Sequence, residues 1–559
     1  MTDTSSNPRP GGQILIDCLR LHGVDTAFCV PGESFLASLD ALHDVPDDIH
    51  LVVCRQEGGV ANMAEAWGKL TGRPGIGFVT RGPGATNASV GVHTAHQDST
   101  PMILFVGQIA RHMVEREAFQ EVDFRRMFGQ MTKWVAQIDD PARIPELVSR
   151  AFHVATSGRP GPVVLAIPED MQTEAADVDD GQPFRPTQAH PGPADMDRLR
   201  QLLAIAERPL VLAGGSPWSI AACNDLKDFA EANQLPVAVT FRRQDLLDNR
   251  HPCYAGVAGL GIDPNLKARI DATDLLIVIG AQLGELVTGG YTYFDFPRTR
   301  QRLVHVAAGV GELGKLHQFE LGINAGMTEF CAAARAMEPV AAEWAAATEA
   351  AHADYLAFSS PQPMPGEVNF SEIVGWLSDH LPEDAILTNG AGNYTAWIHR
   401  FFRHKQYGTQ LGPQSGAMGY SVPAAVAAAV RHPDRVVVSF NGDGCFQMNG
   451  QEIGTAVQEG TRVIFLVITN GMYATIRMHQ ERRYPGRVSG TDLVNPDFAA
   501  LARAYGASGE TVVKTEEFAP AFERARAASG PALIELVIDP EAILPTATLS
   551  GLRDQARDN

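Results

Sequence analysis

Short apolar segments of strand length alternate with helix-like patterns from one end of this 559-residue chain to the other. Strands that are apolar on both faces, rich in β-branched residues and separated by helices indicate parallel sheets covered on both sides. The sequence therefore predicts an α/β fold built from doubly wound, mostly parallel sheets. The expected strands include Ile76–Thr80, Met102–Val106, Pro162–Ile167, Pro209–Ala213, Leu275–Ile279, Val436–Phe440 and Val463–Thr469.

Two segments interrupt this alternation and indicate where domains end. Residues Glu174–Pro193 are acidic and rich in proline and glycine, as interdomain linkers are. A second, proline-rich break at Ser359–Gly366 follows a helical pattern rich in alanine and glutamate. Because 559 residues are too many for one hydrophobic core, we predict three doubly wound domains. Their expected limits are 1–175, 194–340 and 366–559.

The bulk composition narrows the range of partners. A net charge of -20 at pH 7 argues against nucleic acid and against an anionic membrane surface. No apolar run reaches about 18 residues, so we expect no membrane-spanning helix. The polar N-terminal stretch MTDTSSNPRPGG lacks the apolar centre of a signal peptide. Seven cysteines are scattered without a CxxC pair, which is typical of reduced thiols in a cytoplasmic protein.

The strongest chemical signal is a pair of polar residues that follow two neighbouring expected strands. Asp443 lies in a Gly-Asp-Gly turn between a strand and a helix, and Asn470 ends the next apolar strand. Because parallel strands place their carboxyl ends on one side of a sheet, the two side chains can converge. Their oxygens suit Mg²⁺, and the glycines let the backbone approach a phosphate group at a helix start. The alternative is a tight turn in which Asp443 caps the helix.

This arrangement, GDG followed by a helix and by an apolar strand ending in Asn, resembles the cofactor motif of the thiamine-diphosphate enzymes. The resemblance implies that Asp443, the Asn470 side chain and the Met472 backbone carbonyl bind Mg²⁺. It also implies diphosphate contacts from the GDG turn itself and from one further segment, TNGAGNYTAW. Those residues are Gly392, Asn393, Tyr394, Gly442, Gly444 and Cys445. The acetolactate synthases usually have Gln-His in place of Asn393-Tyr394, which leaves these two contacts open.

Thiamine chemistry needs a proton removed from the thiazolium ring, and in this family a glutamate promotes that step through the aminopyrimidine ring. The resemblance assigns this role to Glu57, in CRQEGGVANMAEAWGKLTGRPG. The alternative is a surface glutamate paired with Arg55. Met418, in SGAMGYSVPAA, matches the apolar residue that bends the cofactor, and the Gly416 carbonyl matches the acceptor for the 4′-amino group. From the residues alone, Met418 would be an ordinary core methionine.

The segment TRGPGATNASVGVHTAHQDSTPMILFVGQIARHMVEREAFQEVD is most similar to the acetolactate synthase (acetohydroxyacid synthase) large-subunit branch. This resemblance covers nearly the whole chain and implies decarboxylation of a 2-oxoacid such as pyruvate, with carboligation. It also implies a homodimer or homotetramer in which Glu57 and the metal site meet at a subunit interface. Phe119 and Gln120 match residues near the reacting carbonyl; alternatively, they belong to a loop packed on a neighbouring subunit.

Departures from that branch leave the reaction open. Glu33 stands where the branch usually has a small residue. The 2-oxoacid decarboxylases similarly carry an acidic residue at this position, and there it serves proton transfer. Alternatively, it complements the dipole of an expected helix over 33–42. His479 replaces the tryptophan that selects the acceptor. Near it, an arginine cluster that includes Arg477 could bind a substrate carboxylate or phosphate, or pair with acids such as Glu481.

The last departure concerns FAD. Relatives often carry an aspartate after the strand in LVHVAAGVGELGK, where an acid can bind a ribose hydroxyl. Ala307, Ala308 and Gly309 occupy that stretch here, so FAD is possible but not favoured. Within the family, the alternatives are a non-ligating 2-oxoacid decarboxylase, an acyl-CoA lyase and a flavoenzyme similar to pyruvate oxidase. From another class, a regulatory protein could retain the fold without the chemistry.

Overall fold

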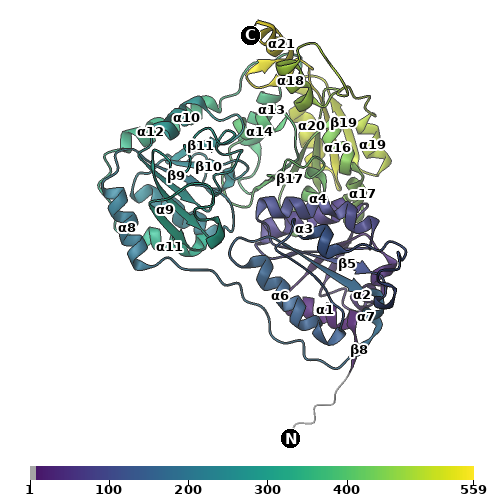
Figure 1. Cartoon of the computed structure of the whole chain (residues 1–559). Helices are drawn as coiled ribbons and strands as arrows, with labels where there is room; N and C mark the ends of the chain where they lie inside the picture. The colour runs from purple at the N-terminus through teal and green to yellow at the C-terminus, as the bar shows by residue number, and fades with distance from the viewer. Residues whose placement is uncertain (1–7, 559) are drawn as a thin grey trace. The chain divides into compact units, whose positions relative to one another are not determined.

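The computed structural model describes residues 8–558 and contains three six-stranded sheets, each with parallel strands throughout (Figure 1). The predicted fold class, α/β with three doubly wound domains, is confirmed. Residues 1–7 and residue 559 lie outside the described residues. Residues 1–7 are the start of the N-terminal stretch in which we expect no signal peptide. The chain divides into two compact units. One runs to Thr187 and includes Val426–Arg431, and the other comprises Gln188–Ala425 and the residues from His432 onward.

The first sheet belongs to the first unit and has the strand order β3-β2-β4-β5-β7-β6. Its strands are β2 (Thr26–Cys29), β3 (His50–Val53), β4 (Gly75–Val79), β5 (Met102–Gln108), β6 (Trp134–Gln137) and β7 (Pro162–Pro168), and its main helices are α1 (Gly11–Leu21), α3 (Glu57–Thr71), α4 (Pro83–Asp98) and α6 (Ile144–Thr156). Helices α1 and α6 share a core with Phe78 and Phe105 on one face. Alternate strand residues point to opposite faces, and on the other face Val60 of α3 packs beside Gly77.

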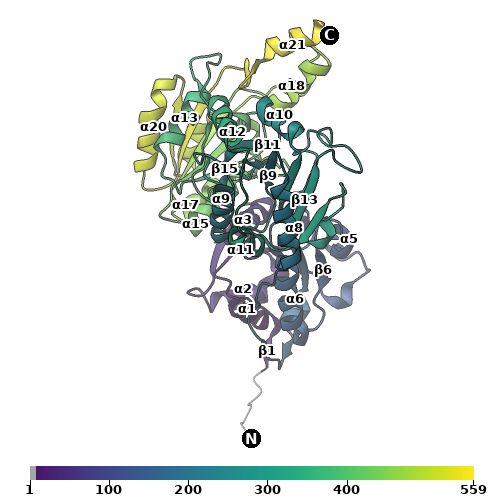
Figure 2. The same ribbon diagram turned by 90° about the vertical axis from the view of Figure 1, so that its left-hand side faces the viewer.

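The second sheet has the order β11-β10-β9-β12-β13-β14. Its strands are β9 (Pro209–Ala213), β10 (Val237–Thr240), β11 (Tyr254–Ala258), β12 (Leu275–Ile279), β13 (Arg302–Ala307) and β14 (Leu321–Asn324), and its helices are α8 (Pro193–Ala204), α9 (Ile220–Ala232), α10 (Pro264–Ala272), α11 (Met327–Ala336) and α12 (Ala345–Phe358). Helices α8, α9 and α11 form a core with Val211 on one face, and α10 and α12 pack with Leu212 on the other. Figures 1 and 2 both show α9 and α11 side by side.

The third sheet has the order β16-β15-β17-β18-β20-β19. Its strands are β15 (Ile386–Asn389), β16 (Gln410–Leu411), β17 (Val437–Gly442), β18 (Val463–Thr469), β19 (Ser508–Val512) and β20 (Ala532–Val537), and its helices are α13 (Phe370–His380), α14 (Thr395–Phe401), α15 (Ser421–Arg431), α16 (Asp443–Asn449), α17 (Ile453–Gln458), α18 (Ala474–Arg483), α19 (Phe498–Ala504), α20 (Thr515–Ala527) and α21 (Leu549–Asp558). Helices α13, α14 and α20 share a core with Phe440. On the opposite face, Ser421 at the start of α15 is hydrogen-bonded to Ser439 at 2.9 Å.

Two local expectations need correction. The segment 33–42 is not one helix: Glu33–Phe35 forms a 3-10 turn before α2 (Leu36–His43). The helix expected after the GDG turn is also interrupted, by a 3-10 turn at Gly450–Glu452 between α16 and α17. The cause is the same in both places, because Phe35 and Asn449 have φ near -140° and so leave the helical region.

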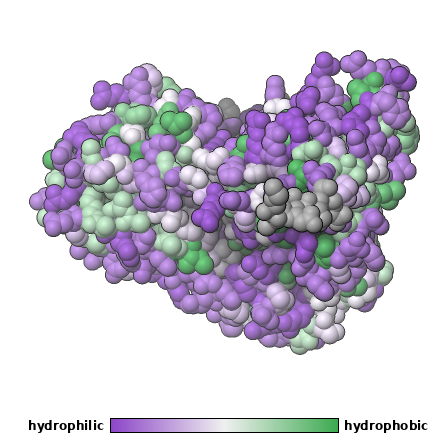
Figure 3. Space-filling view, turned by 90° about the horizontal axis from the view of Figure 1, so that it is seen from below, coloured by the Kyte–Doolittle hydropathy of each residue, from purple (hydrophilic) through white to green (hydrophobic). Residues whose placement is uncertain are grey.

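The surface, the helices and the cysteines accord with the composition. In the face drawn in Figure 3, hydrophilic residues predominate. None of the helices in the described part of the chain combines the length and apolar character needed to cross a membrane. All seven cysteines are buried and free of disulfides. The three sheets fall within 1–175, 194–340 and 366–559, which we retain as the proposed domain limits. Helix α12 packs against the second sheet but lies beyond residue 340.

Candidate functional site

The candidate site lies at the edge of the third sheet where β17 and β18 end. Gly442, the last residue of β17, pairs with Ile468 of β18, so Asp443 and Asn470 follow neighbouring strands at nearly the same level. Asp443 begins α16 and is buried. In open α/β sheets this carboxyl edge is where ligands bind.

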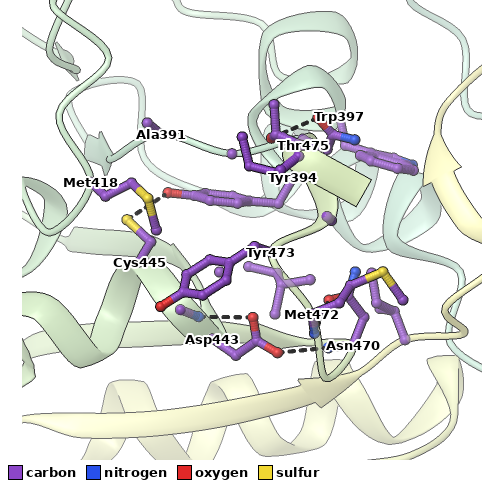
Figure 4. A pocket seen from close by; sticks show the side chains of 18 of the residues that line it. Ala391, Tyr394, Trp397, Met418, Asp443, Cys445, Asn470, Met472, Tyr473 and Thr475 are labelled. Atoms are coloured by element: carbon purple, nitrogen blue, oxygen red, sulfur yellow. Dashed lines mark hydrogen bonds between the residues drawn. The ribbon is translucent and has the colours of Figure 1, made fainter. Parts of the chain in front are cut away.

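The carboxylate of Asp443 is held by four N–H donors, two of which are drawn in Figure 4. One oxygen, Oδ1, accepts a hydrogen bond from the Gly444 amide at 2.8 Å. The other, Oδ2, accepts from the Asn470 amide at 3.2 Å, the Gly471 amide at 2.8 Å and the Asn495 side chain at 2.9 Å. The loop after β18 therefore folds around the carboxylate and brings the Asn470 side chain alongside it.

A second segment fixes the position of this loop. The Leu493 amide donates to the Gly471 carbonyl at 2.8 Å, and the Tyr473 amide donates to the Thr491 carbonyl at 2.8 Å. Within the loop, Asn470 Oδ1 accepts a hydrogen bond from the Met472 amide at 3.3 Å. The amide oxygen of Asn470 is thus oriented by the backbone before any ligand binds.

A cavity of about 250 Å³ opens beside Asp443. All the third-sheet residues that the resemblance assigns to the cofactor line this one cavity, although they come from four separate segments. They are Gly392, Asn393, Tyr394, Gly416, Met418, Gly442, Asp443, Gly444, Cys445, Asn470 and Met472. Trp397, Tyr473, Thr475 and Ile476 also line it and are not marked by any motif in the sequence.

Tyr394 forms part of the cavity wall, and its hydroxyl points toward Met418 and Cys445 (Figure 4). The hydroxyl accepts a hydrogen bond from the Gly390 amide at 3.0 Å and donates to Cys445 Sγ at 3.6 Å. The same sulfur accepts from the Gly419 amide at 3.2 Å. Burial raises the pKa of Tyr394 well above its ordinary value, so the phenol stays neutral. Its hydroxyl is therefore committed to protein partners.

The side chain of Asn393 is also engaged within the protein. Its Oδ1 accepts a hydrogen bond from Thr475 Oγ1 at 2.8 Å, and its Nδ2 donates to the Ile543 carbonyl at 3.0 Å. These bonds tie the loop after β15 to the start of α18 and to the C-terminal segment. Any diphosphate contact at positions 393–394 would then come from the backbone rather than from these two side chains.

The glycines of the GDG turn are required by close packing. A Cβ at position 442 would lie 3.1 Å from the ring of Tyr394, and a Cβ at position 444 would lie 2.5 Å from the ring of Tyr473. A side chain at position 444 would therefore collide with the ring. The two glycines leave room between the aromatic rings for a ligand to approach the backbone.

The donor chemistry of the cavity fits Mg²⁺ and a diphosphate. Mg²⁺ prefers oxygen ligands, commonly one or two carboxylates completed by phosphate oxygens and water. Asp443 offers a carboxylate and Asn470 an amide oxygen, close together and beside glycines that leave the backbone accessible. Across residues 8–558, no group of three or more His, Cys, Asp or Glu side chains is placed to hold a metal. A metal at Asp443 would therefore be held by a mixed set of oxygens.

Glu57 belongs to the first unit, where it begins α3. Gln56 caps this helix by accepting hydrogen bonds from the amides of Gly58, at 2.5 Å, and Gly59, at 3.3 Å. Asn87 of α4 donates to Glu57 Oε2 at 2.9 Å and so orients the carboxylate. This side chain is half-buried and lies in the other compact unit from Asp443.

Arg81, a buried residue in the turn between β4 and α4, joins Glu33 to the backbone of Phe119, the residue before Gln120. Arg81 lies 3.5 Å from the Glu33 carboxylate, donates to Glu169 at 2.9 Å, and donates from Nε to the Phe119 carbonyl at 3.3 Å. Glu33 and Phe119 are exposed on this unit, at 67% for the Glu33 side chain and 72% for Phe119. Gln120 has a positive φ of 66°.

The arginine cluster near His479 is partly neutralised by acids. Arg477 donates to Glu481 at 3.1 Å and lies 3.6 Å from Asp492, and Arg553 donates to the same Glu481 at 2.8 Å. The alternative of pairing with acids therefore holds for Arg477, and its substrate role stays a prediction. Burial of part of the ring, together with the neighbouring arginines, lowers the pKa of His479 below its ordinary value.

In the second sheet, the stretch where relatives often carry an acid follows β13. Ala307 and Ala308 are buried there. His305, on the same strand, is also buried and makes a 3.1 Å hydrogen bond with the Ala281 carbonyl, and burial lowers its pKa. FAD binding at this position stays a possibility that the residues do not favour.

Asn495 is the main residue that the sequence does not reveal. It donates to Asp443 Oδ2, and Gln447 of α16 donates to its side-chain oxygen at 3.1 Å. Asn495 lies in a stretch with no strand or helix, 52 residues after Asp443. No local pattern marks it, because its role depends on a contact made only in the folded chain.

Comparisons with known proteins agree with this geometry. Family models match residues 9–127 (thiamine pyrophosphate enzyme, N-terminal TPP binding domain), 196–334 (central domain) and 390–536 (C-terminal TPP binding domain). The acetolactate synthase large subunit of Parasynechococcus marenigrum is 33% identical over 90% of this chain and 84% of its own. That of Corynebacterium glutamicum is 31% identical, covering 95% and 87%, and the isozyme 2 large subunit of Escherichia coli is 29% identical, covering 95% of both chains. The chain therefore belongs to the thiamine pyrophosphate enzyme family and resembles, within it, the acetolactate synthase large subunits.

Proposed function

We propose that this protein is a thiamine-diphosphate- and Mg²⁺-dependent enzyme that decarboxylates a 2-oxoacid such as pyruvate and joins the remaining fragment to a second carbonyl, as an acetolactate synthase does. The observation that carries the proposal is the single cavity lined by every third-sheet residue assigned to the cofactor. The similarity to acetolactate synthase large subunits supports the carboligation step.

The family resemblance suggests the role of each residue, and the shared cavity supports these roles. Asp443, the Asn470 side chain and the Met472 carbonyl would hold Mg²⁺. The Cys445 amide would face the diphosphate beside Gly444, whose own amide donates to Asp443 Oδ1 in this structure. Met418 and the Gly416 carbonyl line the same cavity and would contact the remainder of the cofactor. When bound, the cofactor supplies an electron sink for the electrons released as CO₂ leaves. Glu57, oriented by Asn87, would hydrogen-bond the aminopyrimidine ring and assist its proton transfer.

The family resemblance, together with the division of these residues between two units of the chain, supports an oligomer. Glu57 belongs to the first compact unit and Asp443 to the second. In the family such halves meet across a subunit interface, so we propose a homodimer or homotetramer, acting in the cytoplasm. Size-exclusion chromatography with light scattering measures this directly, and a monomer with full activity would contradict it.

The first test is to incubate the purified protein with thiamine diphosphate, Mg²⁺ and pyruvate, and to follow both CO₂ and the carbon products. We expect CO₂ release that depends on both additions, together with acetolactate. A protein that binds the cofactor but releases no CO₂ from pyruvate or other 2-oxoacids would contradict the proposal. A matched reaction with Asp443→Asn shows how much of the signal depends on the candidate site.

A second candidate, a non-ligating 2-oxoacid decarboxylase, is favoured by one observation. Glu33 is exposed on the same unit as Glu57, and its carboxylate is held by Arg81 beside the Phe119–Gln120 loop. An acid so placed can protonate the reacting carbon after CO₂ leaves and so favour aldehyde release. Acetaldehyde as the sole carbon product would make this candidate the better description.

A further inference from the structure

A buried arginine of the central domain reaches the loops that line the cofactor cavity. Arg242 follows β10 and is 5% exposed. Its Nη2 donates to the Gly390 carbonyl at 2.8 Å, and its Nη1 donates to the Pro413 carbonyl. Gly390 precedes the cavity-lining segment 391–394, and Pro413 precedes the cavity-lining residues Gly416 and Met418. One guanidinium therefore connects both loops.

Each of the two carbonyls sits at a turn whose geometry shapes the cavity. The Gly390 carbonyl also accepts a hydrogen bond from Asn389 Nδ2 at 2.9 Å. The Pro413 carbonyl also accepts from the Gly416 amide at 3.0 Å, which closes the turn that carries Gly416 at a φ of 69°. The guanidinium thus adds a shared, charge-assisted donor to two carbonyls that each already accept one local hydrogen bond.

Packing holds Arg242 in this position. Its Cζ lies 4.7 Å from the centre of the Phe241 ring, a cation–π contact. A Cβ added at Gly412 would lie 3.0 Å from Arg242 Cδ, so the arginine stem rests directly on the backbone before Pro413. Its backbone adopts a positive φ of 60°, which residues with side chains rarely adopt. The planar, rigid guanidinium is suited to donating to two acceptors at once.

We propose that Arg242 is a positioning residue through which the central domain holds loops 390–394 and 413–418 in the arrangement that binds thiamine diphosphate. The proposal rests on the proposed function only in taking that cofactor as the ligand of the cavity. Removing the guanidinium should loosen both loops and weaken cofactor binding, while leaving each carbonyl with its second donor. The variant is therefore expected to fold.

The test is calorimetric titration of thiamine diphosphate, at fixed Mg²⁺, into the full-length wild type, Arg242→Met, Arg242→Lys and Gln244→Met. Gln244 is a matched control, because it is also buried and links the central domain to the third sheet. It donates to the His399 carbonyl at 2.9 Å and accepts from Gln410 at 2.9 Å, and its hydrogen bonds within residues 8–558 do not involve loops 390–394 or 413–418. We expect Arg242→Met to raise the cofactor Kd at least ~10-fold, Arg242→Lys by less, and Gln244→Met by about twofold at most.

Two further readouts separate positioning from general damage. Thermal unfolding of the cofactor-free proteins should place Arg242→Met near Gln244→Met, and kcat at saturating cofactor should fall much less than the Kd rises. Gly412→Ala, whose Cβ would lie 2.9 Å from the Asn389 amide oxygen and 3.0 Å from the arginine stem, should raise the Kd as well, through both donors to the Gly390 loop. If Arg242→Met fails to fold, Arg242→Lys carries the test.

The outcomes distinguish this proposal from the proposed function. No binding of thiamine diphosphate to the wild type would overturn the proposed function itself, and this proposal with it. Normal binding to the wild type with an unchanged Kd for Arg242→Met would overturn the role of Arg242 and leave the function standing. An equal loss of affinity in Gln244→Met would show that domain packing, and not the two loop contacts, sets the affinity.

Discussion

The backbone amide of Gly471 donates a hydrogen bond of 2.8 Å to the carboxylate of Asp443, 28 residues earlier in the chain. This bond joins the ends of two neighbouring strands and closes the loop after β18 around the acid. The carboxylate is thus fixed where an oxygen-binding cation would need it, and the loop that closes on it carries Asn470. Substitutions at either end of this contact should therefore weaken metal binding more than they lower the stability of the fold.

Asp443→Asn should abolish Mg²⁺-dependent cofactor binding. The substitution removes the charged ligand and turns one oxygen that accepts N–H groups into a donor facing other donors. We expect kcat/KM to fall by at least about 100-fold, with the loss visible as absent Mg²⁺-dependent heat in titrations of thiamine diphosphate. Asp497→Asn, which alters a helix-capping carboxylate on α19, is the control and should bind normally. Retained affinity in Asp443→Asn would place the metal elsewhere.

Asn495→Ala tests the residue that the sequence does not reveal. Loss of its donor to Asp443 Oδ2 leaves the carboxylate with its three backbone partners, so the protein should fold. Residues that orient a metal ligand typically contribute 10–100-fold to affinity, and we expect a rise of about 10-fold in the apparent Kd for Mg²⁺. Titration of activity with Mg²⁺ measures it; an unchanged midpoint would show that the backbone amides alone orient Asp443.

A mixture of two inactive variants should recover activity if the site is shared between subunits. In a dimer of Glu57→Gln and Asp443→Asn subunits, one site would carry both changes and the other neither. A 1:1 mixture with free exchange would regain about a quarter of the wild-type sites. The measurement is CO₂ release after mixing and re-equilibration. If the mixture stays as inactive as its components although mixed dimers form, each site is built from a single subunit.

Glu33→Gln should change the products more than the consumption of pyruvate. If the Glu33 carboxyl supplies the proton for aldehyde release, its loss should lower acetaldehyde formation by about 100-fold or more, while acetolactate formation is retained. The product ratio, measured by chromatography, reports this directly. Glu169→Gln removes the other acid bonded to Arg81 and is the matched control, with an unchanged ratio expected. The same ratio in wild type and Glu33→Gln would assign Glu33 a role in local structure only.

Glu481 makes stability depend on pH in the acid range. The bonds from Arg553, with those from the Gly486 amide and Arg477, lower the pKa of Glu481 from 4.5 to about 2. A carboxyl with a depressed folded-state pKa stabilises the protein above the unfolded value, and this stabilisation is lost as pH falls through the folded value. Glu481→Gln should therefore melt below wild type at pH 7, and the difference should shrink between pH 4.5 and about 2.

The control for that measurement is Glu510→Gln. Glu510 pairs with Arg524 on the surface, where both side chains are exposed, and exposed pairs contribute little to stability. Its melting temperature should stay close to that of wild type throughout. A gap for Glu481→Gln that is constant with pH would show that lost packing, not the charge of Glu481, causes the destabilisation.

The parts of the fold that the sequence predicted share one physical property. The strands β9, β12 and β18 have the expected bounds, because each is buried and apolar for almost its whole length. Strand β19 (SGETV) has one buried residue, Val512, and its apolar pattern is too weak to indicate a strand. It forms because β20 supplies a backbone partner along its full length.

In the site, too, residues marked by a local sequence pattern could be predicted, and residues placed by distant contacts could not. Asp443 and Asn470 could be assigned because each follows directly after a strand in a recognisable local pattern. Asn495 and Arg242 could not, because their contacts reach across 52 residues to Asp443 and across 148 residues to Gly390. The residues around Asn495 and Arg242 in the sequence do not indicate these partners. The contacts depend on the order of the strands in the sheet and on the packing of two domains.

Tyr394 bears on which small molecules the cavity can accept. Its ring rests on Gly392 and Gly442, and its hydroxyl is already bonded to Gly390 and Cys445. An inhibitor shaped for relatives with an imidazole at this position would lose a hydrogen-bond partner here and meet an aromatic surface instead. Compounds that place a flat apolar group against the phenol should be selective for this protein, and compounds that place a charged group there should bind it more weakly.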